Sequence, residues 1–133
     1  MSETTRLVAG ILLLSLVTVE TGGLYLVRVV QGAAPATPFQ LGFARAGHAH
    51  AAVLLILSLT GLLYADAAHL AGVWGWLSRI GVPVAALLMP GGFFFSSMGK
   101  DRTTPNGFIA LVYAGAIVLA AGLASLGIGL LIA

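Results

Sequence analysis

The chain has 133 residues, of which 59% are hydrophobic and only 8% are charged. A typical soluble domain is about 25% charged, so this composition excludes a soluble enzyme. Six basic and four acidic residues give a net charge of +2 without a basic cluster, which excludes a nucleic-acid-binding protein. The absence of cysteine excludes disulfides, iron–sulfur clusters and haem ligation by a thiolate. An integral membrane protein remains.

Four apolar segments are long enough to cross a bilayer, which requires about 20 residues each. We expect these spans at about 7–30, 42–64, 77–98 and 107–133. The first is too long for a signal peptide and lacks a cleavage site, so we expect it to be retained. No internal repeat or second domain is visible. The sequence therefore predicts an all-α protein, a single transmembrane domain built as a four-helix bundle.

Four spans place both termini on one side of the membrane, here called the first side. The connections at 31–40 and 100–106 then lie on the second side. More basic residues lie near the second side, namely Arg28, Arg45, Lys100 and Arg102, than near the first, which has Arg6 and Arg79. The positive-inside rule therefore predicts that the second side is cytoplasmic. We expect a multi-pass protein of a bacterial inner membrane.

The last span carries a regular series of glycines, Gly115, Gly122 and Gly129, spaced by seven residues. Glycine lets helices approach closely in lipid, where packing rather than exclusion from water holds them together. The series predicts either tight packing within the bundle or an interface between subunits. The spacing alone does not distinguish these two alternatives.

Ionisable residues interrupt the first two spans. A charged Asp, Lys or Arg at the centre of a span costs about 2.5–3.5 kcal/mol on insertion scales, and such residues commonly mark functional sites. At about 1.5 Å per residue, Glu20 lies roughly 15 Å below the second face, His50 roughly 12 Å and His48 roughly 9 Å. Arg28 and Arg45 lie roughly 3–5 Å below that face. Tyr113 falls in the same half, so we expect one polar site there, with Glu20 facing a histidine.

The histidines belong to the segment His48-Ala49-His50. Residues two apart on a helix point about 200° away from each other, so both cannot ligate one metal ion. One histidine can therefore bind a cofactor while the other contacts a neighbouring helix, subunit or second cofactor. Ala46 and Gly47 are small and leave room for a flat macrocycle beside His50. Arg45 shares a face with His48 and can pair with a propionate.

The stretch Phe43-Ala44-Arg45-Ala46-Gly47-His48 resembles the second span of the styrene oxide isomerase family. That family consists of small four-span proteins, related in arrangement to the haem–copper oxidase core, that form trimers. A Trp-Ala-Arg-Ala-His motif supplies the axial histidine of haem b, and the ferric haem acts as a Lewis acid that isomerises aryl epoxides. Gly47 occupies the place of the family histidine, with His48 one residue later, so the resemblance implies haem binding more directly than epoxide isomerisation.

The leading hypothesis is a membrane-embedded haem b protein, either a Lewis-acid isomerase or a small-molecule or redox protein. Its expected axial ligand is His48, which the resemblance favours, and the alternative is His50, which depth and small neighbours favour. Arg45 or Arg28 pairs with a propionate, and Glu20 supports the ligand. We expect a homo-oligomer, with a trimer implied by the resemblance, and a small apolar molecule as a possible partner. The alternatives are a copper- or proton-handling protein using Glu20, His50 and Met98 or Met89, or a structural subunit without a cofactor.

Overall fold

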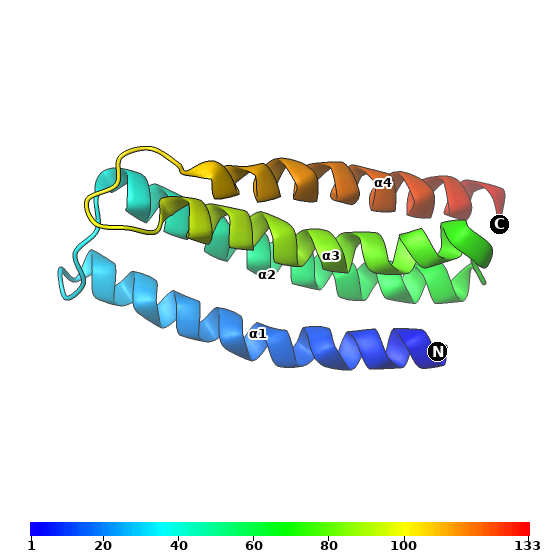
Figure 1. The fold of residues 1–133 in the computed structure, drawn as a ribbon. Helices are drawn as coiled ribbons and strands as arrows, with labels where there is room; N and C mark the ends of the chain where they lie inside the picture. Colours follow the sequence, from blue (N-terminus) through cyan, green and yellow to red (C-terminus); the bar gives the residue numbers. More distant parts are fainter.

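A computed structural model describes all 133 residues as four long helices without strands. The helices are α1 (Glu3–Val30), α2 (Pro38–Ala67), α3 (Gly72–Ser97) and α4 (Ala110–Ile132), and a 3-10 turn, η1 (Gly107–Ile109), precedes α4. All four are long and apolar enough to cross a membrane when η1 is counted with α4. The predicted all-α membrane bundle is therefore confirmed. Both termini lie at the same end of the bundle (Figure 1), which is the first side.

The helices begin where the sequence supplies capping groups. The Ser2 side chain accepts a hydrogen bond from the Thr5 N–H at the start of α1. Thr37 and Gln40 form a reciprocal capping box at the start of α2, where Pro38 occupies the first turn. The Asn106 side chain accepts from the Phe108 N–H at η1. These caps satisfy main-chain N–H groups that a helix leaves unpaired at its start.

The observed helices differ in length from the expected spans. α1 and α2 begin about four residues earlier than expected and α2 ends at Ala67, while α3 runs from Gly72 to Ser97. α3 continues through Pro83 and Pro90, which membrane helices tolerate when neighbours satisfy the freed carbonyl groups. The extra residues of α1, at 3–6, are polar, whereas those of α3, at 72–76, are apolar or glycine, so the helices extend beyond the expected spans at both kinds of segment.

The helices lie in the order α1, α2, α3, α4 across the bundle, with α1 and α4 on opposite flanks (Figure 1). α1 packs mainly against α2, and almost none of α1 is buried. The core lies between α2 and α3, where Leu62 and Val82 are both 1% exposed. One broad flank of α1 therefore has no partner within the chain.

The glycine series of the last span packs inside the bundle. A Cβ added to Gly122 would lie 3.0 Å from the Cα of Gly81 on α3, and one added to Gly115 would lie 2.5 Å from the Met89 side chain. Gly129 faces Leu70 in the same way, at 2.8 Å. Of the two alternatives, the structure therefore supports tight α3–α4 packing for this series. The glycines themselves leave no room there for a second subunit.

Candidate functional site

The two histidines of α2 point to different neighbours. His48 lies against Gly22 and Gly23 of α1, and the ring of His50 lies 5.0 Å from the ring of Phe93 on α3, measured between centroids. The expectation that the pair serves two faces of one helix is met by this geometry. A single ion bound by both side chains is excluded in this arrangement.

His48 is packed with its nitrogen-bearing edge toward α1. A Cβ added at Gly23 would lie 3.3 Å from Cε1 and 3.5 Å from Nε2 of His48, and one added at Gly22 would lie 3.4 Å from Nδ1. The two glycines therefore accommodate the imidazole between the helices. A macrocycle bound to His48 would require α1 to move away from α2. The contact between His48 and the two glycines is therefore a packing contact between these helices.

His50 is held in a defined tautomer. Its Nδ1 lies 2.8 Å from the carbonyl oxygen of Ala46, and because a carbonyl only accepts hydrogen bonds, Nδ1 must carry a proton. In the neutral ring this leaves a lone pair on Nε2, which has no hydrogen-bond partner in the chain. Since no side-chain nitrogen or oxygen is both fully buried and unpaired, Nε2 is also not sealed inside the bundle.

The surroundings of His50 are partly open. Ala46 is half-buried and Ala49 and Val53 are exposed, so the residues nearest His50 on the outer face of α2 are small or β-branched, and exposed Arg45 lies one turn before Ala49 on that face. Gly47 does not contribute the free space that the sequence suggested, because a Cβ there would lie 3.1 Å from the Phe94 ring. The glycine instead lets Phe93 and Phe94 of α3 pack closely on α2.

Glu20 does not face a histidine of its own chain. It is exposed on α1 and takes part in no hydrogen bond or ion pair, so the expected contact with His48 or His50 is wrong. Thr5 contacts Asp66, and His48 contacts Gly22 and Gly23, so counting along the antiparallel helices places Glu20 level with His50, as the depth estimate predicted. Rotation about the α1 axis, which depth does not determine, directs its side chain away from the bundle.

The remaining predicted site residues also lie on the surface. Arg28 and Arg45 are exposed without an acidic partner, and Tyr113 is 66% exposed on α4. The expected single polar site is therefore not assembled within one chain. No three His, Asp or Glu side chains lie close enough to hold a metal ion. Of the copper site considered from the sequence, Met89 is buried beside Gly115, whereas Glu20 and Met98 are exposed, so one chain does not bring Glu20 to His50.

A cavity of about 420 Å³ opens near the second side between α1, α2 and α3. Aromatic and sulfur-containing side chains wall it, among them Tyr25, Phe94, Phe95 and Met98. Neither histidine lines it.

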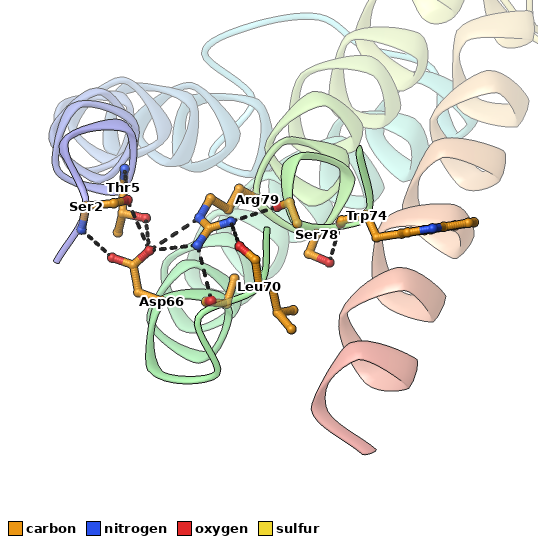
Figure 2. A network of polar contacts seen from close by, with 9 residues as sticks. Ser2, Thr5, Asp66, Leu70, Trp74, Ser78 and Arg79 are labelled. Atoms are coloured by element: carbon orange, nitrogen blue, oxygen red, sulfur yellow. Dashed lines mark hydrogen bonds and ion pairs between the residues drawn. The ribbon is translucent and has the colours of Figure 1, made fainter. Parts of the chain in front are cut away.

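The most extensive polar network lies at the first side, at the opposite end of the bundle from the predicted polar site. Asp66 at the end of α2 accepts hydrogen bonds from the Ser2 N–H at 2.6 Å and from the Thr5 hydroxyl at 3.0 Å (Figure 2). It also pairs with Arg79 of α3 at 3.0 Å, and both side chains are more than four-fifths buried. The network thus joins three helices.

Arg79 satisfies main-chain carbonyl groups around the α2–α3 turn as well. Its Nη1 donates to Leu70 O at 2.8 Å and to Gly75 O at 3.0 Å, and its Nη2 donates to Ala65 O at 3.2 Å (Figure 2). The guanidinium fork suits this arrangement because its donors diverge in one plane. Every polar group of the network has a partner, which indicates a structural role. In the sequence, the sign of this network is that Asp66 and Arg79, an acid and a base 13 residues apart, lie on either side of a turn.

Comparisons with protein-family models, curated proteins and solved structures gave no match for this chain.

Proposed function

We propose that the chain is a membrane-embedded haem b-binding protein in which His50 is the axial ligand. The observation that carries this proposal is the hydrogen bond from His50 Nδ1 to Ala46 O, which leaves Nε2 as the free lone pair. Histidines that ligate metals commonly donate their other N–H to a carbonyl or carboxylate, and this fixes the ring orientation. His48 has no such bond, and its ring nitrogens face α1.

The side chains that could ligate iron in this chain fit haem b better than other iron cofactors. The chain has no cysteine for a thiolate or cluster ligand, and its second histidine points to another helix. Haem held by a single imidazole supplies a Lewis-acid or redox centre with an open coordination position. The small side chains of Ala46, Ala49 and Val53 leave the outer face of α2 accessible beside that ligand.

The exposed arginines support the same proposal. Arg28 and Arg45 lie near the second side and have no acidic partner in the chain. A guanidinium group binds a carboxylate with two parallel hydrogen bonds, so either residue suits a propionate at the membrane surface. Because Arg45 lies on the His48 side of α2, a propionate partner for haem on His50 comes more readily from another copy.

The resemblance in the second span adds the reaction class and the assembly to the proposal. A Lewis-acid isomerisation of a small apolar molecule such as an aryl epoxide, in a homo-oligomer of the bacterial inner membrane, fits a site open on one face of α2. A trimer is the assembly that the resemblance favours.

The absorption spectrum of the purified protein tests this proposal. The chain is expressed with added haem precursor, purified in mild detergent, and assayed for a Soret band and a b-type pyridine haemochrome. The expected result is about one haem per chain. A colourless preparation that also takes up no added haemin would overturn the proposal. Tight retention of copper by a colourless protein would favour the alternative function instead.

A further inference from the structure

The cavity near the second side runs from the membrane surface into the bundle. At its surface end it is lined by Pro35 and Gly99, which belong to the connections between helices. At its inner end it is lined by Phe94 and by Tyr25, which lies five residues before α1 ends at Val30, or about 8 Å deeper. The cavity therefore follows the membrane normal, with main chain at the surface and aromatic rings toward the bilayer interior.

Hydrogen bonds within the chain fix the surface end of the cavity. Nε2 of Gln40 donates to the carbonyl oxygens of Ser97 at 3.1 Å and Gly99 at 2.8 Å. The Thr37 hydroxyl donates to the carbonyl oxygen of Arg102. These bonds join the start of α2 to the end of α3 and to the connection that follows it. The surface end is thus held in place without a ligand.

The side chain of Arg102 lies against this end of the cavity. A Cβ added to Gly99 would lie 3.1 Å from Nε and 3.5 Å from Cγ of Arg102. Gly99 has a φ of +124°, a conformation that favours glycine, and its missing side chain leaves the space that Arg102 occupies. Because Gly99 lines the cavity, the guanidinium group is held beside the surface end.

This guanidinium group has no anionic partner in the chain. Both ion pairs of the chain lie at the first side, and Arg102 has no carboxylate oxygen within 4.0 Å, not even that of the neighbouring Asp101. Its one hydrogen bond runs from Nη1 to Thr104 O at 3.5 Å. A guanidinium group has five N–H donors and binds a phosphate through two parallel hydrogen bonds. Arg102 therefore offers unused donors and an unpaired positive charge beside an apolar cavity.

We infer that this cavity binds one anionic phospholipid from the surrounding membrane. The phosphate pairs with Arg102 at the membrane surface, and an acyl chain follows the cavity inward past Tyr25 and Phe94. No acidic residue lines the cavity to receive the ammonium group of a zwitterionic headgroup, and Lys100 beside Gly99 repels such a group. Basic pockets between membrane helices bind anionic headgroups in this way.

This lipid site is independent of the proposed haem site. Neither histidine lines the cavity, and His50 lies beside Phe93 on α3. Arg28 and Arg45, the candidate partners of a propionate, have no part in the lipid site. The inference therefore goes beyond the proposed function and can fail or succeed separately from it.

Native mass spectrometry of the delipidated protein in detergent tests the inference. The protein is titrated with phosphatidylglycerol and, separately, with phosphatidylcholine that has the same acyl chains. We expect one phosphatidylglycerol per chain to bind about tenfold more tightly than phosphatidylcholine, because only the former matches the unpaired charge. Equal affinities for the two lipids would overturn the inference.

Two variants of the α3–α4 connection separate a defined site from general attraction to a basic surface. Arg102→Gln and Lys100→Gln each remove one positive charge, but only Arg102 lies against Gly99. Arg102→Gln is expected to weaken phosphatidylglycerol binding about tenfold and Lys100→Gln about twofold or less, with Arg102→Lys between them. Equal losses in the two glutamine variants would contradict a site at Arg102.

Two variants of the α1–α2 connection test whether the acyl chain enters the cavity. Ala36 and Ala33 are both exposed in this connection, but only Ala36 lines the cavity. Ala36→Trp is expected to abolish the preference for phosphatidylglycerol, whereas Ala33→Trp retains it. Unchanged binding in Ala36→Trp would show that the lipid contacts the surface alone, and would overturn the inference.

Haem content separates the two proposals. Arg102→Gln is expected to keep the haem content of the parent chain while it loses the lipid preference. Loss of haem in Arg102→Gln would assign this arginine to a propionate and overturn the lipid site. A colourless protein that still prefers phosphatidylglycerol would leave the lipid site standing and remove the haem proposal.

Discussion

Gly81 on α3 and Gly122 on α4 face each other so closely that a Cβ added to Gly81 would lie 2.7 Å from the Cα of Gly122. The two helix backbones are therefore in direct contact at this point. Close backbone approach at small residues is a principal source of helix association in membranes. The contact makes α3 and α4 one tightly packed unit and assigns the glycine series to the interior of the chain.

Gly122→Leu is accordingly expected to destabilise the fold without changing the oligomeric state. Overpacking a close contact typically costs about 1–3 kcal/mol, which lowers the midpoint of thermal unfolding in detergent. Gly127→Leu is the matched control, because nothing lies within 4 Å of a Cβ at Gly127. Native mass spectrometry that shows a changed subunit number for Gly122→Leu alone would contradict the internal assignment.

The ion pair between Asp66 and Arg79 is expected to hold the first side together. Asp66→Asn removes the charge partner of a mostly buried guanidinium, and breaking such a pair costs about 3–5 kcal/mol. Thermal unfolding followed by tryptophan fluorescence measures the loss, since Trp74 and Trp76 lie in the adjacent first turns of α3.

The control for this experiment is Glu3→Gln. Glu3 and Arg6 form an exposed pair at 4.0 Å, and exposed pairs contribute little. An unfolding midpoint for Asp66→Asn that matches the Glu3→Gln midpoint would show that the network does not stabilise the bundle.

Gly23→Val tests the interpretation of His48 as a packing residue. A Cβ at this position lies 3.3 Å from the His48 ring before the two valine methyl groups are added. We expect weaker α1–α2 packing, seen as faster proteolysis of the α1–α2 connection, with haem content retained. Gly10→Val is the control, since a Cβ at Gly10 meets nothing within 4 Å. Loss of haem in Gly23→Val but not in Gly10→Val would assign the ligand role to His48.

The sequence predicted the number of spans, the common end of both termini, and the opposite directions of His48 and His50. These features follow from segment length and from the geometry of a helix, which neighbouring helices do not alter. It also predicted that Glu20 and His50 share a level, because depth depends only on counting residues.

The rotation of each helix about its axis could not be predicted in the same way. In lipid the outer face of a span is as apolar as its inner face, so the hydrophobic pattern does not identify the buried side. This is why the predicted direction of the Glu20 side chain was wrong. It is also why the sequence did not distinguish packing within the bundle from a subunit interface for the series Gly115, Gly122 and Gly129. The network at Asp66 and Arg79 was missed because both residues lie beside a turn, where solvated charges are common.

The central claim is that His50 is the axial haem ligand. A comparison of the haem content of the His50→Ala and His48→Ala variants tests it most directly. Both variants are purified in parallel and assayed by pyridine haemochrome against the parent chain, with free imidazole added as a rescue. The account predicts that His50→Ala loses nearly all haem and regains a Soret band with imidazole, whereas His48→Ala keeps its haem with a modest band shift. Full haem in His50→Ala, or loss confined to His48→Ala, would contradict it.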